Sequence, residues 1–444
     1  HSCSACGRLV HLLNRSHLDH ISSTAVTSPK IRLHFLDALR AFAILMMLQG
    51  HFVDTLLAPE YRDLNSPIFN AWTFMRGLTA PVFFTVTGIV FVFLLLKENK
   101  PLKEHVRVRK GIRRAFFLLA LGYLLKWNVY SVLSLNFAPY HIAVDVLHVI
   151  GLALLALIGI YAFHRVTGAS YPFVSGLLGL SVFLVFPVIE QADWSNLPIV
   201  FQNYMTMENG STFTILPWLG YTLIGGVIGS VVHYHTAWFK QWWMPVLLLT
   251  AGLWLHFSSY TIFTNIHQML GWDLSQMWLS KQYLFWRFGH VLVVLSLFVF
   301  FEQILKKGFH PLFLKIGSET LTVYGGHYVI LYGTWFGIGL SQLWKRSLTP
   351  EQTLLGVALF ELFFILLIAH IEKVRQVWYE ALPAMLVRAF RKIRVMVLRR
   401  SRRILLEYRR EQPAIVQAIQ VMAFQILHRA FHLIPANTLR RYTK

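Results

Sequence analysis

The chain has 444 residues, of which 56% are hydrophobic and only 14% are Asp, Glu, Lys or Arg. A soluble domain of this length needs more polar surface than such a composition supplies. The formal net charge of +21 does not by itself indicate nucleic acid, because most of the charge falls in a few loops and in the C-terminal region. Composition therefore excludes an ordinary soluble protein and favours a membrane protein.

Apolar runs recur about ten times along the chain, and each is long enough to cross a hydrocarbon core of about 30 Å. We therefore expect an all-α polytopic membrane protein with about ten transmembrane helices. The expected spans are Phe35–Leu57, Thr79–Leu96, Ala115–Val132, Val144–Phe163, Tyr171–Val188, Ile215–Val232, Trp242–Ile262, His290–Leu305, Leu321–Leu340 and Leu354–Ile371.

The distribution of basic residues predicts the orientation. The segment 97–114 between spans two and three carries eight Lys or Arg, and the region after span ten is also strongly basic. Acidic residues gather in the opposite loops, for example at Asp54, Glu190 and Asp273. Because cytoplasmic loops are enriched in Lys and Arg, we expect both termini in the cytoplasm.

Three regions follow from this pattern: a cytoplasmic tail over 1–31, a membrane domain over 32–372, and a basic region over 373–444. No signal-peptide pattern opens the sequence, so the first region is expected to be a soluble tail or an incomplete start. Cys3 and Cys6 form a Cys-x-x-Cys pair near several histidines. One such pair is a weak zinc signal, and we expect no metal.

The basic region carries an apolar stripe at helical spacing, formed by Leu386, Phe390, Ile393 and Val397, with arginines between. This pattern predicts a surface helix that contacts either anionic lipids or a partner protein. Nucleic acid is not expected, given the membrane spans upstream. A second stretch, Ala414–Ile434, is amphipathic; we expect it to lie in the interface, with an eleventh span as the alternative.

The first span holds three polar residues in line. At about 100° per residue, Asp37, Arg40 and His51 share one face of the helix. At a rise of about 1.5 Å per residue, Arg40 and His51 lie about 16 Å apart along the axis. Ionisable groups in a membrane span are costly and usually face a cavity or a partner, so this face is the first candidate for chemistry.

These residues resemble a known family. The pattern Leu36-Asp37-x-Leu39-Arg40, ending in His51, resembles the first transmembrane helix of membrane-bound acyltransferases, and the chain is most similar to the heparan-α-glucosaminide N-acetyltransferase-like family. The likeness extends over about 32–370 in the segments 74–88, 145–152, 217–229 and 321–327. One departure is Ala41, where the family usually has Gly after the Arg.

The resemblance implies that an acyl group, acetyl by family likeness, passes from cytosolic acyl-CoA to an acceptor, a sugar by family likeness, across the membrane. His51 would be the catalytic histidine, since an imidazole suits a general base or a transient acyl carrier. Arg40, Arg113 and Arg114 would hold the phosphates of acetyl-CoA, and Asp37 would orient Arg40.

A second group is predicted at the outer side. Asp145 and His148 share a face at the outer end of span four, and Arg76 precedes span two. The pair is expected to be catalytic, and Arg76 and His327 are expected to bind the acceptor. Interfacial anchoring is the alternative for the outer residues, and a helix–helix hydrogen bond is the alternative for His327.

Two other functions fit part of the sequence. The chain could be a non-catalytic acyltransferase-like subunit of a larger membrane complex, which the terminal regions would suit. It could also be a transporter, although no inverted repeat is visible. The resemblance is compatible with a homodimer. The compact loops favour a bacterial inner membrane as the location.

Overall fold

The structure is a computed structural model that describes residues 33–134, 138–377, 394, 396–398, 401 and 414–432. In these residues every regular element is a helix, and one isolated parallel bridge joins Leu57 to Leu348. The chain divides into two compact units. Unit 1 comprises the chain up to Ala43 together with Phe74–Ser318, and unit 2 comprises Ile44–Thr73 together with the chain from Glu319 onward. The all-α membrane architecture expected from the sequence is confirmed.

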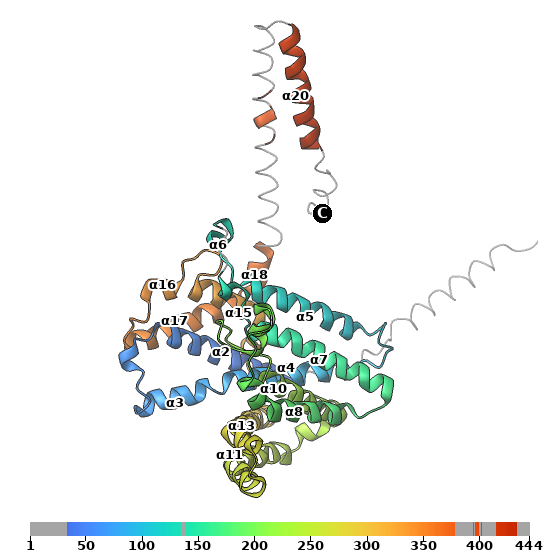
Figure 1. Cartoon of the computed structure of the whole chain (residues 1–444), viewed down its shortest axis with the longest axis vertical. Coiled ribbons are helices and arrows are strands. Elements are labelled where there is room, and N and C mark those ends of the chain that lie inside the picture. The colour runs from blue at the N-terminus through green and yellow to red at the C-terminus, as the bar shows by residue number, and fades with distance from the viewer. Residues whose placement is uncertain are drawn as a thin grey trace, which may run out of the picture. The chain divides into compact units, whose positions relative to one another are not determined.

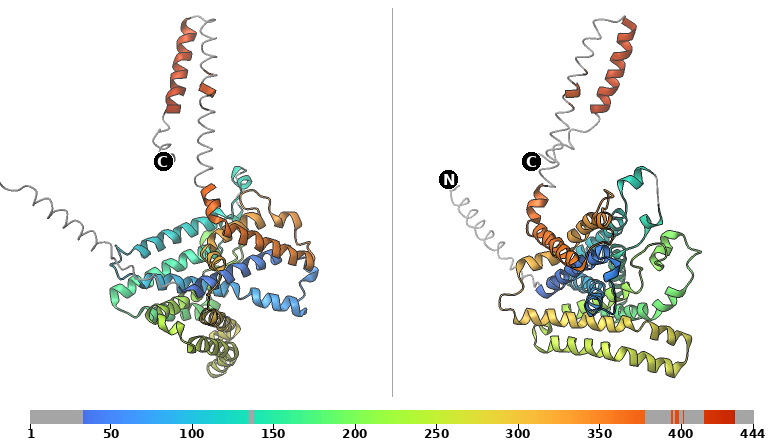
Figure 2. Two further views of the ribbon diagram at one scale, coloured as in Figure 1. Left: turned by 180° about the vertical axis from the view of Figure 1, so that it is seen from behind. Right: turned by 90° about the vertical axis from the view of Figure 1, so that its left-hand side faces the viewer.

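Helices α2 (His34–Leu56) and α3 (Pro67–Arg76) each contribute residues to both units. The remaining helices of unit 1 are α4 (Thr79–Leu96), α5 (Val106–Leu124), α6 (Val129–Leu133), η2 (Pro139–Ile142), α7 (Val146–Thr167), α8 (Tyr171–Gln191), α9 (Ile199–Met205), α10 (Trp218–Tyr234), η3 (Thr236–Lys240), α11 (Trp243–Leu270), α12 (Asp273–Ser280), α13 (Tyr283–Ile304) and α14 (Pro311–Ser318). Helix α5 runs beside α7 (Figure 1), and α11 runs beside α13 (Figure 2).

Glycines allow α4 and α10 to pack backbone against backbone. A Cβ at Gly88 would overlap the carbonyl oxygen of Thr222, and a Cβ at Gly225 would overlap that of Thr85. Small residues at a helix crossing let two backbones approach closely in a membrane. The same device joins α14 to the start of α2, where a Cβ at Gly317 would overlap the Asp37 carbonyl.

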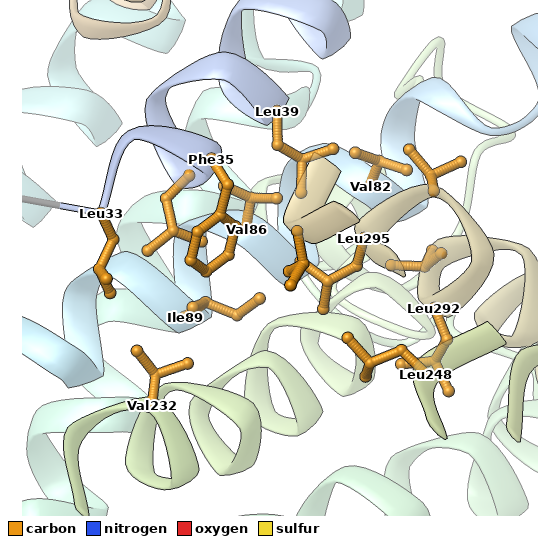
Figure 3. Close-up of a cluster of buried hydrophobic side chains, with 14 of the residues drawn as sticks. Leu33, Phe35, Leu39, Val82, Val86, Ile89, Val232, Leu248, Leu292 and Leu295 are labelled. Atoms are coloured by element: carbon orange, nitrogen blue, oxygen red, sulfur yellow. The ribbon is translucent and has the colours of Figure 1, made fainter. Parts of the chain in front are cut away.

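The apolar core of unit 1 includes residues of α4 and α10. Figure 3 shows Phe35 and Leu39 of α2 meeting Val86 of α4 and Leu295 of α13. The start of α2 is also fixed by a polar contact, because the backbone N–H of His34 donates to Oε1 of Glu302 at 2.9 Å. A carboxylate suits the unpaired N–H groups at a helix N-terminus. Glu302 therefore caps α2.

Unit 2 contains η1 (Pro59–Tyr61), α15 (Thr320–Tyr332), α16 (Leu340–Trp344), α17 (Pro350–Ala369), α18 (Ile371–Gln376) and α20 (Ala414–His432). The second half of α2 packs on α17, where the Phe52 ring lies 5.3 Å from that of Phe360. Gly356 leaves room for Phe52, since a Cβ there would come within 2.5 Å of its ring.

Seven segments of the described chain are long and apolar enough to cross a membrane, and they contain α2, α4, α7, α8, α11, α13 and α17. The other three expected spans correspond to α5, α10 and α15, which are shorter or more charged. The expected number of about ten crossings therefore stays a prediction.

Several expected boundaries were wrong. The span expected at Leu321–Leu340 ends at Tyr332, because Gly333 adopts a left-handed φ of 69° that stops the helix. The span expected at Ala115–Val132 begins earlier and ends at Leu124. The span expected at His290–Leu305 begins at Tyr283, so Arg287 lies inside its first turns.

The structure describes only part of the two terminal regions for which predictions were made. The Cys3–Cys6 pair lies outside the described residues, as does nearly all of the apolar stripe over 386–397. The amphipathic stretch 414–434 is helical as α20, Ala414–His432. Its position relative to a membrane stays a prediction, as do the limits of the three regions.

Candidate functional site

His51 lies in the part of α2 that belongs to unit 2, and the end of α15 brings Tyr332 to it. The Tyr332 hydroxyl lies 3.0 Å from Nδ1 of His51, which is a hydrogen bond. Thr55, one turn further along α2, reaches the same hydroxyl with its Oγ1 at 3.5 Å. The aromatic ring of Tyr332 meets the imidazole edge-on, with ring centroids 6.2 Å apart.

His327 completes this cluster from α15. Its ring centroid lies 5.2 Å from that of His51, and the side chain is fully buried. Neither ring nitrogen of His327 has a well-formed hydrogen bond among the described residues. The structure thus brings together two of the residues that the sequence singled out.

The backbone of unit 2 explains why these side chains meet. Gly333 ends α15 directly after Tyr332, and a Cβ there would overlap the backbone at Ile338. Gln342 ties the following loop back, because its Nε2 donates to the Tyr332 carbonyl at 3.1 Å. Tyr332 is therefore held at a fixed helix end.

The C-terminal end of α2 is fixed by Arg62. Its guanidinium donates to the carbonyls of Val53, Asp54 and Leu57, with the shortest bond at 2.7 Å. Terminal carbonyls of a helix lack partners within the helix, so a cation here satisfies them and complements the helix dipole. Arg62 thereby stabilises the turn that follows His51.

The residues expected to bind acetyl-CoA lie in unit 1. Nη1 of Arg40 is 3.7 Å from Oδ1 of Asp37, as expected for residues three apart on one helix. Arg114 of α5 lies within electrostatic range of Arg40. Arg113 is exposed on the same helix. Two cations from different helices thus come near each other, which suits a polyanionic ligand.

Asp145 and His148 form a second cluster in unit 1. Asp145 caps α7, because its Oδ1 accepts from the Leu147 backbone N–H at 3.0 Å. Nδ1 of His148 lies 2.9 Å from the same Oδ1 and 3.1 Å from the Asp145 backbone nitrogen. Both side chains are almost completely buried. The capping box is a structural role that the sequence analysis missed for this pair.

The neighbours of this pair were not predicted. The His148 ring packs edge-on against Tyr123 at 4.2 Å between centroids, and the Tyr123 hydroxyl lies 2.8 Å from that of Tyr204. Lys126, two residues after the end of α5, is only 6% exposed. Burial lowers the pKa of Lys126, and the nearby Asp145 carboxylate opposes that shift. In the sequence Lys126 shows only that it follows a long apolar run, as ordinary interfacial anchors also do.

Arg76 ends α3 in unit 1, where its side chain is exposed. Arg287 of α13 approaches the same helix end, with Nη1 3.4 Å from the Phe74 carbonyl oxygen. The predicted roles of Arg76 and of the other candidate residues stay predictions. Among the described residues, no group of three or more His, Cys, Asp or Glu is arranged to hold a metal ion.

Comparison with known proteins identifies part of the chain. Residues 32–250 match the sequence model of a family described as heparan-alpha-glucosaminide N-acetyltransferase, catalytic. The match covers just under half of the chain, includes His51, and ends within α11, before Tyr332. A search of curated proteins gave no match. Residues 32–250 thus resemble the catalytic domain of the heparan-α-glucosaminide N-acetyltransferase family.

Proposed function

We propose that the chain transfers an acetyl group from cytosolic acetyl-CoA to an acceptor at the opposite membrane face, with a sugar as the acceptor. The family supports an acetyltransferase-type membrane enzyme. The observation that carries the proposal is the contact between the Tyr332 hydroxyl and Nδ1 of His51 at 3.0 Å. A phenol hydrogen-bonded to Nδ1 fixes the orientation of the ring and leaves Nε2 as the proton-exchanging atom.

In the proposed step, Nε2 of His51 removes a proton from the acceptor hydroxyl or amine as that group attacks the thioester carbonyl carbon. The new acyl bond forms, the C–S bond breaks, and the imidazolium returns its proton to the departing thiolate. This step requires that Nδ1 carries the ring proton and donates to the Tyr332 oxygen. The same tautomer serves the alternative in which Nε2 attacks first and briefly carries the acyl group.

The donor end of the proposal uses unit 1. Arg40 and Arg114, which lie within electrostatic range of each other, would bind phosphates of acetyl-CoA, with Arg113 as a further cation. Asp37 would hold the Arg40 side chain in place from the preceding turn. Arginine suits this role because its planar guanidinium forms bidentate bonds to phosphate and stays charged.

The acceptor end of the proposal uses four of the candidate residues. Asp145 and His148 are proposed to act on the acceptor, and Arg76 and His327 to bind it. The burial of His327 against His51 supports a role for its ring in shaping the site. Anionic lipids or a partner protein are proposed to contact the basic C-terminal region, and the bacterial inner membrane is the proposed location.

The test uses the purified full chain in detergent. Acetyl-CoA binding is measured by calorimetry, and release of the CoA thiol is measured in the presence of candidate amino sugars. We expect binding with a dissociation constant on the order of 1–100 µM, as for typical enzyme substrates. Arg40→Ala should weaken binding, while His51→Ala should leave binding intact and reduce thiol release by about 10²-fold or more.

Arg165→Ala is the matched control, because it removes an arginine whose guanidinium donates to Oδ1 of Asn99. It should behave as the wild type. If the wild type binds neither acetyl-CoA nor a longer acyl-CoA, the enzyme assignment fails. The non-catalytic subunit and the transporter would then be the functions to pursue, starting from the proteins that co-purify.

A further inference from the structure

The cluster around Asp145 contains a buried lysine whose charge is not matched by a close ion pair. Lys126 is 6% exposed, and its ammonium lies 4.9 Å from the ring centroid of Tyr140. Asp145 is within electrostatic range, but no described residue forms a hydrogen bond or an ion pair with this ammonium. Burying a cation is costly unless an anion or several acceptors compensate it. Lys126 therefore has the properties of a ligand-binding group.

The Asp145 carboxylate, which acts on Lys126 electrostatically, is also bound at the start of α7. Its Oδ1 is engaged by the Leu147 backbone N–H and by Nδ1 of His148, at 3.0 and 2.9 Å. These contacts fix the carboxylate at the start of α7, where it caps the helix. The Asp145 carboxylate, which caps α7, thus supplies a negative charge within electrostatic range of the Lys126 ammonium.

A second polar atom in the cluster lacks a partner. Nε2 of His148 is buried and makes no hydrogen bond among the described residues. Nδ1 is engaged by the Asp145 carboxylate and by the Asp145 backbone N–H, so Nε2 is the ring nitrogen left for a further contact. A hydroxyl group suits this atom, because a hydroxyl can either donate or accept a hydrogen bond. Buried polar atoms are normally satisfied, so an unsatisfied one calls for an explanation.

Two hydroxyl groups border the same histidine. Tyr123 packs edge-on against the His148 ring, and its hydroxyl pairs with that of Tyr204 at 2.8 Å. Tyr204 and Tyr140 are both within electrostatic range of Asp145. Tyrosine side chains supply both hydroxyl groups for hydrogen bonds and aromatic surface for stacking with a ring-shaped polar ligand. The cluster thus combines an ammonium group, an imidazole nitrogen and phenol groups within unit 1.

We propose that Lys126, His148 and the Tyr123–Tyr204 pair bind a hydroxylated anion, in which Lys126 contacts a carboxylate or phosphate and Nε2 of His148 forms a hydrogen bond with a hydroxyl. A sugar acid and a sugar phosphate share this chemistry. The proposal rests on the proposed function where it takes this ligand to be the acetyl acceptor; the binding itself needs no acyl transfer.

The test measures binding to the full chain in detergent with three probes at equal ionic strength: D-glucuronate, D-glucose 1-phosphate and D-glucose. The wild type should bind at least one anion about tenfold or more tightly than glucose, as expected for a charge-assisted contact. The anion that binds more tightly distinguishes a carboxylate ligand from a phosphate ligand. Lys126→Met, which keeps most of the unbranched apolar chain and removes the charge, should abolish the preference for anions.

Lys281→Met is the matched control. Lys281 also lies over an aromatic ring, that of Phe186, but its ammonium is paired with Glu190. This variant should keep the preference for anions. Equal binding of all three probes by the wild type, or an unchanged anion preference in Lys126→Met, would overturn the proposal.

A second measurement covers the case in which Lys126→Met does not fold. Amine-reactive labelling of wild-type Lys126, followed by mass spectrometry, should be slowed by the bound anion and not by glucose; equal labelling rates would overturn the proposal. Acetyl-CoA binding is measured in the same sample. Loss of anion binding with acetyl-CoA binding intact overturns only this inference, and the reverse result overturns only the proposed function.

Discussion

At the scale of single residues, the contact between Tyr332 and His51 makes the sharpest prediction. Tyr332→Phe removes the hydroxyl that lies 3.0 Å from Nδ1 of His51, so the ring loses the partner that orients it. We expect the turnover number for acetyl transfer to fall by about 10- to 100-fold, with a smaller change in KM. The rate of CoA thiol release at saturating acetyl-CoA measures this.

The control for this variant is Tyr328→Phe. Tyr328 lies one turn earlier on α15, and its ring centroid is 5.2 Å from that of Tyr332. It therefore tests the loss of a neighbouring phenol on the same helix. Equal rates for Tyr332→Phe and the wild type would show that the hydroxyl does not orient the catalytic ring.

Arg62 makes a prediction about stability close to the same residue. Arg62→Met removes the hydrogen bonds to the carbonyls of Val53, Asp54 and Leu57. The loss should destabilise the end of α2 by about 1–3 kcal/mol, because terminal carbonyls lose their partners. Hydrogen–deuterium exchange should become faster over 56–62. Lys345→Met, which removes an exposed cation from the same unit, should leave the exchange unchanged; faster exchange in both variants would argue against a specific cap.

At the scale of elements, glycines determine how closely α4 and α10 can approach. Gly225→Ala would place a Cβ against the Thr85 carbonyl oxygen. Since neither backbone can move without shifting its helix, we expect a loss of about 1–3 kcal/mol or more in the free energy of unfolding. Thermal unfolding in detergent, followed by tryptophan fluorescence, should show a lower midpoint.

Gly159→Ala is the control for this prediction. Gly159 lies inside α7, and an added Cβ would meet nothing within 4 Å. The substitution should be neutral or stabilise the helix by up to about 1 kcal/mol, because alanine has the higher helix propensity. If the two alanine variants unfold at the same temperature, close packing of α4 on α10 is not what stabilises unit 1.

The helices could be predicted from the sequence because membrane spans need long apolar runs, and such runs are visible without tertiary information. Their ends were less predictable. Leu321–Leu340 is apolar throughout, yet its helix stops at Tyr332, because Gly333 makes a left-handed turn that hydropathy does not reveal.

The candidate site could also be predicted only in part from the sequence. His51 was found because a histidine in line with Asp37 and Arg40 is unusual in an apolar helix. Tyr332 and Lys126 were missed, because their importance depends on which residues the fold places beside them. Tyrosines and a lysine near the ends of apolar runs are common as interfacial anchors, so the sequence alone offers no contrast.

At the scale of the whole molecule, the path of the chain through the membrane depends on whether α5 crosses it. Its first turns carry five basic residues, Arg107, Arg109, Lys110, Arg113 and Arg114, so its composition differs from that of the other spans. At about 1.5 Å per residue, its 19 residues nevertheless extend to about 28 Å, close to the thickness of the hydrocarbon core. Arginines at a helix end can extend their charged groups into the lipid interface.

We therefore predict that α5 crosses the membrane with its basic end in the cytoplasm. In a background with Cys3 and Cys6 replaced by Ser, Lys100→Cys should react with an impermeant maleimide only in inverted vesicles. Ser134→Cys and Ser195→Cys, at exposed positions after α5 and α8, should react in intact cells. Labelling of all three from one side would mean that α5 lies along the membrane surface. The cations proposed to bind acetyl-CoA would then need a new assignment, because Arg113 and Arg114 would no longer mark the cytosolic end of a crossing.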